Sequence, residues 1–210
     1  MVGNCTVFNF DKLGLLDYYY HFGLKFDNLN IGKFGATRLA SFVPELPDIK
    51  RTSEGKCKTG QAKLKVIAET VINSRYYDSN GSTINSAFQS DFNGQPEANP
   101  LTYTDGLGMN LSFRSTIQHE SMHKDYIDTF IQQTRAALGE VEGIEACCAC
   151  VVAKLEEANA KMNFYSAVRT YNDRMLDHLA YKEPSASTSN VDAAKAVLNA
   201  AETKSTAACK

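Results

Sequence analysis

The chain has 210 residues, of which 43% are hydrophobic and 22% are charged, and this balance is typical of a globular protein that buries a sizeable core. The formal net charge of -2 argues against a surface that binds polyanions broadly. No apolar run approaches the roughly 20 residues that cross a bilayer, and no basic region precedes an apolar core at the start. We therefore expect no membrane segment, no secretory signal, and a location in the cytoplasm or within an assembled particle.

The first predicted element is an aromatic helix within the segment Val7 to Phe26, with Asp11 as its N-cap. Apolar side chains cover most of its circumference, so this helix has to be buried on more than one side. One small domain does not easily provide two such surroundings, which favours a contact with another subunit. The side chains expected at that interface are Tyr18, Tyr19, Tyr20 and Phe22.

Two further helices are expected before residue 76. A short one covers Ala36 to Phe42 and has to end near Pro44, because proline cannot continue a helix. The second runs from Gln61 to Arg75, since its apolar residues recur at steps of three and four. Those apolar residues are Leu64, Ile67, Ala68, Val71 and Ile72.

Positive charge concentrates between residues 50 and 65. Glu54 is the single acid in this stretch, so nucleic-acid phosphate or an acidic partner would bind here if the protein binds either. A solvated surface without a ligand is the other interpretation. The basic residues are Lys50, Arg51, Lys56, Lys58, Lys63 and Lys65.

The middle of the chain predicts a loop and then a hairpin. Residues 77–99 are rich in Ser, Asn and Gly without a sustained period, which indicates a long surface excursion of the kind that often carries function or interactions. Residues 101–113 alternate apolar and polar side chains around Asp105 and Gly106, which predicts a small β-hairpin.

From Phe113 to Tyr181 the apolar residues again recur at steps of three and four, which predicts helix throughout this stretch. Gly139 and Gly143 interrupt the good helix formers. The stretch is therefore expected to form two long helices that meet near these glycines, as a hairpin or as a bend.

His119, Glu120 and His123 form a motif with chemical potential, H-E-x-x-H. On a helix this spacing places two imidazoles on one face to bind zinc, and the carboxylate between them can take a proton from metal-bound water. The three residues resemble the zinc-binding segment of the zincin hydrolases, although Ser121 and Lys124 stand where that family usually has apolar or small residues. The resemblance implies that His119 and His123 are zinc ligands and that Glu120 is a general base.

A third zinc ligand has to come from another segment. Glu140, Glu142 and Glu145 follow the motif along the chain, with His178 more remote, and we select Glu145. The alternative without metal is a pair of histidines that are hydrogen-bonded within a bundle or at an interface.

Six cysteines would suit a disulfide framework in an exported chain. Cys147, Cys148 and Cys150 crowd one helical turn, where they cannot easily pair with one another. We expect small buried apolar side chains in reducing surroundings, and the alternative is metal or thioether chemistry at Cys147 and Cys150. The sequence leaves the state of the cysteines open.

Pro184 ends the long helical stretch, and a small polar linker leads to a last short helix capped by Asn190. Its apolar stripe is thin, and Val197 and Leu198 on this stripe are further predicted interface residues. We therefore expect a single helical domain over residues 1–183, followed by a linker and C-terminal arm over residues 184–210.

Together these patterns predict a mainly α fold, a helical bundle organised on a long helix pair with a small β-hairpin and a C-terminal arm. The predicted function is a non-enzymatic structural subunit of a larger ordered assembly, such as a virion coat or scaffold protein, and its partners are copies of itself or other subunits. No cofactor is expected for that role. One alternative is a zinc-dependent hydrolase that uses His119, Glu120 and His123, and another is a monomeric or small-oligomer adaptor that docks a partner on the long helix.

Overall fold

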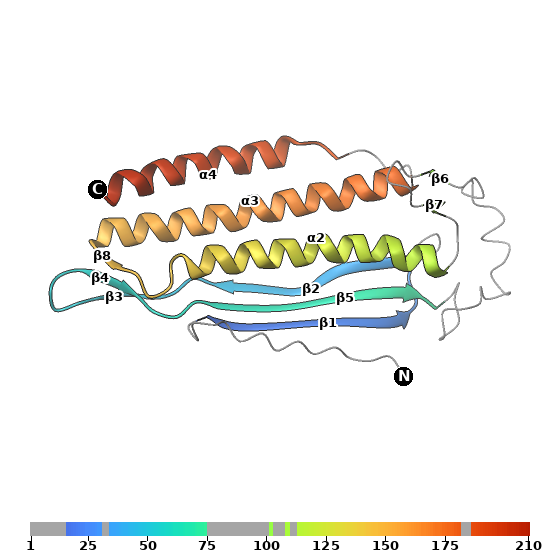
Figure 1. Ribbon diagram of the computed structural model, residues 1–210, viewed down its shortest axis with the longest axis horizontal. Coiled ribbons are helices and arrows are strands. Elements are labelled where there is room, and N and C mark those ends of the chain that lie inside the picture. The colour runs from blue at the N-terminus through green and yellow to red at the C-terminus, as the bar shows by residue number, and fades with distance from the viewer. Residues whose placement is uncertain (1–15, 31–33, 75–100, 103–107, 110–112, 182–185) are drawn as a thin grey trace.

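The computed structural model describes residues 16–30, 34–74, 101–102, 108–109, 113–181 and 186–210. These residues form a three-stranded sheet on which three long helices are stacked in successive layers (Figure 1). Strands β1 (Asp17–Asp27), β2 (Gly35–Glu45) and β5 (Lys63–Asn73) make the sheet in the order β1-β5-β2. The central β5 is parallel to β1 and antiparallel to β2.

The helices are α2 (Phe113–Gly139), α3 (Cys148–Tyr181) and α4 (Ser189–Ala208). Helix α2 packs against β2 and β5, α3 packs against α2, and α4 packs against α3 (Figure 1). Within the described residues, none of the helices combines the length and the apolar character that crossing a bilayer requires.

A mainly α bundle organised on a long helix pair is therefore the wrong fold class, because the fold is mixed α/β. Helices α2 and α3 do occupy the stretch in which the three-and-four spacing predicts helix. The error comes from the first 75 residues, where all three predicted helices fall on strands: β1 replaces the aromatic helix, β2 the short helix, and β5 the helix from Gln61 to Arg75.

The apolar residues of β5 fit both the three-and-four spacing of a helix and the alternation of a strand, which explains the error. Leu64, Val66 and Ala68 alternate along the strand and are buried against the helices, while Lys63 and Lys65 between them are exposed. Near the end of the strand both faces become buried, so the alternation is lost there. The high content of Val, Ile and Thr decides for the strand, because branched side chains pack well on a pleated surface.

The core lies between the sheet and the helices α2 and α3. It contains side chains from β5, such as Leu64 and Val66, from α2, such as Ile127 and Leu138, and Met162 from α3. Tyr18, Tyr20 and Phe22 of β1 pack against the same core, so the sheet and the helices share one apolar interior.

The turn between α2 and α3 makes the two helices an antiparallel hairpin, not a bend (Figure 1). Gly143 has a φ of 65°, a left-handed conformation that glycine adopts without steric cost. The Thr59 hydroxyl donates a 2.7 Å hydrogen bond to the Val141 carbonyl and accepts a 2.9 Å bond from the Ile144 amide. The turn is thereby fixed to the sheet side of the molecule.

A second small sheet lies next to that turn, formed by β3 (Ile49–Arg51), β4 (Cys57–Thr59) and β8 (Glu145–Ala146) in antiparallel pairing. The predicted hairpin is represented by β6 (Leu101–Thr102) and β7 (Gly108–Met109), which pair antiparallel. The predicted surface excursion over residues 77–99 and the predicted N-cap Asp11 lie outside the described residues.

Candidate metal centre

Two histidines of α2 and two aspartates of α3 face each other near one end of the helix pair. His119 and His123 are four residues apart, as are Asp173 and Asp177, so each pair lies on one face of its helix. Because the helices run antiparallel, the earlier histidine meets the later aspartate. His119 therefore contacts Asp177, and His123 contacts both Asp173 and Asp177.

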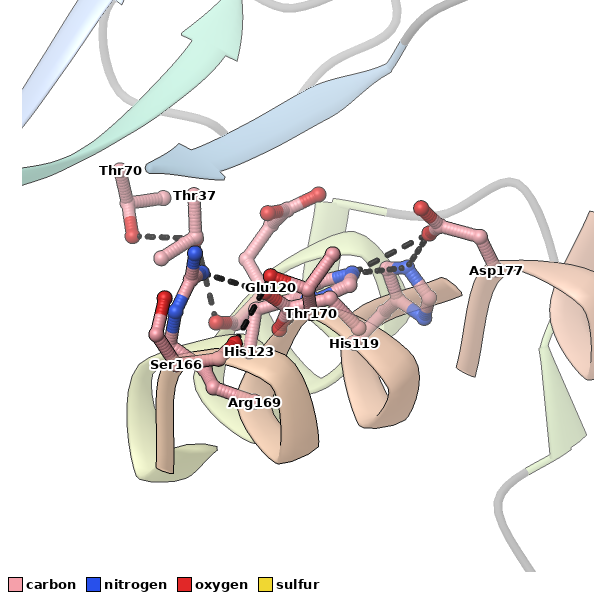
Figure 2. Close-up of polar contacts among 10 residues, drawn as sticks. Thr37, Thr70, His119, Glu120, His123, Ser166, Arg169, Thr170 and Asp177 are labelled. Atoms are coloured by element: carbon pink, nitrogen blue, oxygen red, sulfur yellow. Dashed lines mark hydrogen bonds and ion pairs between the residues drawn. The ribbon is translucent and has the colours of Figure 1, made fainter. Parts of the chain in front are cut away.

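Three possible ligand atoms converge at this point (Figure 2). The Nε2 atoms of His119 and His123 are 3.1 Å apart, and the Asp177 Oδ1 atom lies 3.2 Å from the first and 3.1 Å from the second. The three atoms thus form a nearly equilateral triangle. Ligands of a tetrahedral zinc ion, with bonds of about 2.0–2.1 Å, are separated by about 3.3–3.4 Å. The observed triangle is close to one face of such a coordination polyhedron.

Hydrogen bonds between neutral histidines and Asp177 do not account for the triangle. An imidazole nitrogen carries at most one hydrogen and directs it along one line, and a carboxylate can only accept. The Nδ1 atom of His123 lies 3.1 Å from the Asp173 Oδ1 atom, so it must carry a proton that it donates to Asp173. In the neutral ring of His123 the Nε2 atom then presents a lone pair to Asp177, which is repulsive unless a cation lies between the two atoms.

A proton can supply that positive charge when no metal is bound. Burial alone would lower the pKa of His123, but its hydrogen bonds to Asp173 and Asp177 outweigh burial and raise the pKa to about 9. For Asp177, burial acts to raise the pKa, and the hydrogen bonds from His119 and His123 outweigh it and hold the pKa of this carboxyl well below its usual range. The site is therefore arranged to hold a positive charge between these groups.

Glu120 faces the sheet, away from Asp177 (Figure 2). A Cβ atom added to Gly35 of β2 would lie 2.7 Å from its Oε1 atom, so the carboxyl group packs directly on the β2 backbone. Its Oε2 atom is buried and has no hydrogen-bond partner among the described residues, and burial raises the pKa of Glu120 above its ordinary value. The Thr37 hydroxyl donates a 3.1 Å hydrogen bond to the Glu120 backbone carbonyl, which ties this turn of α2 to β2.

The carboxylate next to the two histidines is Asp177, and the predicted third ligand Glu145 lies elsewhere. Glu145 is an exposed residue of β8, opposite Lys58, and β8 lies beyond the far end of α2 (Figure 1). About 20 residues of helix separate His119 from that end, which corresponds to roughly 30 Å. Glu140 pairs with Lys161, and Glu142 accepts a 3.0 Å hydrogen bond from the Ala62 amide, so both are engaged at the same far end.

The predicted basic patch is divided among several elements. All six of its side chains are exposed, and Lys50 and Lys58 are opposite each other on β3 and β4. Acidic neighbours accompany them: Glu54 pairs with Lys56, and Glu45 pairs with Lys63. The remaining members of the patch are Arg51 and Lys65.

Most of the predicted interface residues are partly or fully buried. Tyr18, Tyr20 and Phe22 pack against the core, and Leu198 is 4% exposed. Tyr19, on the opposite face of the sheet, is 37% exposed, and Val197 is 60% exposed. These last two are the members of the predicted interface that remain on the surface.

Four of the described cysteines form disulfides, contrary to the expectation of reduced apolar side chains. Cys57 of β4 is bonded to Cys148, and Cys150 is bonded to Cys209 after the end of α4. Cys147 is an exposed thiol that donates to the Ala208 carbonyl at 3.6 Å. Neighbours in one turn of α3 thus pair with distant partners, and the proposed metal chemistry at Cys147 and Cys150 does not fit a disulfide at Cys150. The C-terminal arm is covalently attached to the domain.

Asp173 and Asp177 are the site residues that sequence reasoning missed. The signal that could have identified them is their spacing of four residues on a helix, which matches the spacing of His119 and His123 on the helix before it.

Comparison of the chain with protein-family models, with curated proteins and with solved structures gave no match.

Proposed function

We propose that this protein binds a divalent transition metal, zinc, between α2 and α3, with His119, His123 and Asp177 as its ligands. The observation that carries this proposal is the triangle of two Nε2 atoms and one carboxylate oxygen, with sides of 3.1–3.2 Å. Both histidines are buried and the Asp177 side chain is 36% exposed, so water can reach one side of the site. Three protein ligands and one position open to water are typical of zinc sites that bind an external ligand.

The choice of zinc rests on the ligands and on the disulfides. Two imidazoles and one carboxylate also suit ferrous iron, which takes such ligands on one face of an octahedron. Two disulfides in the described part of the chain favour an oxidising compartment over the cytoplasm expected from the sequence. Ferrous iron is oxidised in such surroundings, whereas zinc has no redox chemistry. We therefore also propose that the chain matures in an oxidising compartment.

The zinc hydrolase predicted from the motif requires a general base within hydrogen-bond reach of the metal-bound water. The packing of Glu120 against Gly35, on the sheet side of α2, does not support that role for its carboxylate. The geometry favours a zinc ion that joins α2 to α3 over the zincin mechanism that the motif resembles.

Metal content and metal affinity test the proposal. The purified full chain, with its disulfides intact, is expected to carry one zinc per chain or to take up one zinc in a calorimetric titration after chelation. His119→Gln, His123→Gln and Asp177→Asn should each lose most of this affinity. Matched controls are His21→Gln on the opposite face of the sheet and Asp192→Asn on α4, which should bind zinc as the unchanged protein does.

A metal-free ion-pair cluster is the competing interpretation, with protonated His123 between Asp173 and Asp177. It predicts no stoichiometric zinc and no difference in zinc affinity between Asp177→Asn and Asp192→Asn. A titration with ferrous iron under anaerobic and reducing-agent-free conditions separates the two metals. Tighter binding of iron than of zinc would contradict the choice of zinc but not the site.

The assembly-subunit function predicted from the sequence does not depend on the metal site and remains a prediction. Of the predicted interface residues, Tyr19 and Val197 are exposed, so such contacts could be built on them. Sedimentation of the purified chain tests it, because a large particle is expected for an assembly subunit and a small species for an adaptor. Tyr19→Ser and Val197→Ser should shift a particle toward monomer if those surfaces are used.

A further inference from the structure

Asp173 lies one turn before Asp177 on α3 and contacts the same histidine from the other side. Its Oδ1 atom is 3.1 Å from the Nδ1 atom of His123, whereas Asp177 contacts the Nε2 atom. The two aspartates therefore have different partners on one ring. Asp173 is not one of the three ligands. Its Oδ1 atom contacts the Nδ1 atom of His123, on the side of the ring that faces away from His119 and Asp177.

The second oxygen of Asp173 is also held. The Arg169 Nη1 atom donates a 2.6 Å hydrogen bond to Oδ2, so each oxygen of this carboxylate has its own donor. The Arg169 guanidinium lies 5.7 Å from the centre of the Phe130 ring, and that ring lies 4.7 Å from the Phe42 ring of β2. A line of contacts thus runs from the sheet through α2 to Asp173, and it fixes the direction in which Oδ1 points.

We infer that Asp173 is a positioning residue for the metal site: it holds the proton of His123 on Nδ1 and turns the Nε2 lone pair toward the metal. This inference rests on the proposed function. A carboxylate that accepts the distal N–H of a ligating histidine fixes the tautomer, orients the ring and raises the basicity of the ligand nitrogen. Arg169 in turn fixes Asp173, because its bond to Oδ2 leaves Oδ1 for the ring.

The ion pair of Asp173 with Arg169 could serve only to stabilise α3, and this alternative has to be distinguished from a role at His123. Arg169 and Asp173 are four residues apart, a spacing common for surface pairs of small energetic effect. If the pair only stabilised the helix, the loss of Asp173 would change neither the Nδ1–H proton of His123 nor the zinc affinity. If Asp173 positions His123, its loss has to appear at the ring nitrogen and in the zinc affinity.

The test compares Asp173→Ala and Asp173→Asn with the unchanged full chain and with the control Asp192→Asn. The alanine variant is expected to bind zinc about 10–100-fold more weakly, which is the usual effect of removing such a partner. The asparagine variant keeps an oxygen that accepts from Nδ1–H and should lose less affinity than the alanine variant. Asp192 is an exposed acid in the first turn of α4, so its replacement removes the same charge at a remote position.

Nuclear magnetic resonance of the histidine nitrogens provides a measurement that should change only if Asp173 positions His123. In the zinc-loaded protein the Nδ1–H proton of His123 should be protected from exchange, and Asp173→Ala should abolish this protection while zinc remains bound at saturating concentration. Helical circular dichroism verifies the fold of each variant, and Asp173→Asn supplies the comparison if the alanine variant does not fold.

The outcomes separate the inference from the proposal beneath it. Wild-type zinc affinity and a protected Nδ1–H proton in both Asp173 variants would overturn the positioning role and leave the metal site intact. Absence of zinc binding by the unchanged chain would overturn the metal site, and the role of Asp173 with it. Weaker zinc binding in Asp173→Ala, with partial recovery in Asp173→Asn, would support both.

Discussion

The disulfide between Cys150 and Cys209 joins the first turn of α3 to the residue that follows α4. Cys148, two residues earlier in the same turn, is bonded to Cys57 of β4. One turn of α3 thus holds a strand on one side and the C-terminal helix on the other. Leu198 and Ser205 are the buried residues of α4, so the covalent link adds to a contact with α3 that buries few side chains of this helix.

Removing this disulfide should loosen α4 first. The 59-residue separation corresponds to a loop-closure effect of about 4 kcal/mol, and measured effects are typically about 2–4 kcal/mol. We expect Cys150→Ser combined with Cys209→Ser to lower the free energy of unfolding by about that amount in chemical denaturation. Amide exchange in α4 should rise more than exchange in α2. Cys147→Ser is the matched control, because Cys147 is not in a disulfide, and equal α4 protection in the double variant would contradict the prediction.

Protonation of Glu157 at acid pH should lower the free energy of unfolding. Burial acts to raise its pKa, but the ammonium groups of Lys154 and Lys161, 2.9 Å and 3.0 Å from its carboxylate oxygens, outweigh burial and lower the pKa to about 2. A carboxyl whose folded pKa is lowered stabilises the fold above its unfolded pKa of about 4.3, and this stabilisation is lost as pH falls toward the folded value.

The comparison is between the unchanged protein and Glu157→Gln, measured by denaturant unfolding at several pH values. The variant should be less stable at neutral pH, and its unfolding free energy should fall less steeply between pH of about 4.3 and about 2. Glu202→Gln, at an exposed position of α4, serves as control and should follow the unchanged protein. Parallel curves for Glu157→Gln and Glu202→Gln would show that the ion pairs of Glu157 have no effect on folding.

Gly35 should tolerate no side chain while Glu120 is present. A Cβ atom there would lie 2.7–3.0 Å from three atoms of the Glu120 side chain, closer than real contacts of this kind. Because Glu120 is buried and cannot swing into solvent, Gly35→Ala should lower stability by about 1–3 kcal/mol. The cost should shrink in a Glu120→Ala background, which a double-mutant cycle measures. Gly60→Ala is the control, since its nearest neighbour would be 3.8 Å away.

The hydrogen bond between Tyr20 and Asp128 should stabilise the contact of β1 with α2. The Tyr20 hydroxyl donates a 2.7 Å bond to the Asp128 Oδ1 atom, and burial followed by this bond raises the pKa of Tyr20 well above its usual range. Tyr20→Phe should therefore cost about 1 kcal/mol of unfolding free energy. Tyr19→Phe, on the opposite and more exposed face of β1, should cost nothing measurable. Equal costs would show that the bond to Asp128 adds no stability.

Local sequence patterns could identify the helices of the site and its two histidines but not its two aspartates. The three-and-four spacing predicts α2 and α3, and the H-E-x-x-H motif places His119 and His123 on one face. The choice of Asp177 over Glu145 depends on the register of two antiparallel helices. That register is set by the turn over residues 140–147 and by its hydrogen bonds to Thr59, which are contacts between distant segments.

The sheet and the disulfides were not predicted, because both depend on contacts between segments that are distant in the sequence. The apolar residues of β5 fit a helical spacing as well as an alternating one, and the choice depends on whether β1 and β2 lie beside it. Six cysteines allow 15 complete pairings, so the partners of Cys148 and Cys150 could not be chosen without the fold.

Zinc should stabilise the fold through the contact of α2 with α3. A ligand that binds only the folded chain adds about 2.7 kcal/mol at a free concentration one hundred times its dissociation constant. Denaturant unfolding of the full chain, with zinc buffered at that concentration and again with a chelator, should show this increment. His119→Gln should lose the increment, because it removes one of the three ligands, while His21→Gln should keep it. Amide exchange should slow on zinc addition around His123 and Asp177 and not in α4. The same zinc-dependent increment in His119→Gln would place the stabilising ion elsewhere in the chain.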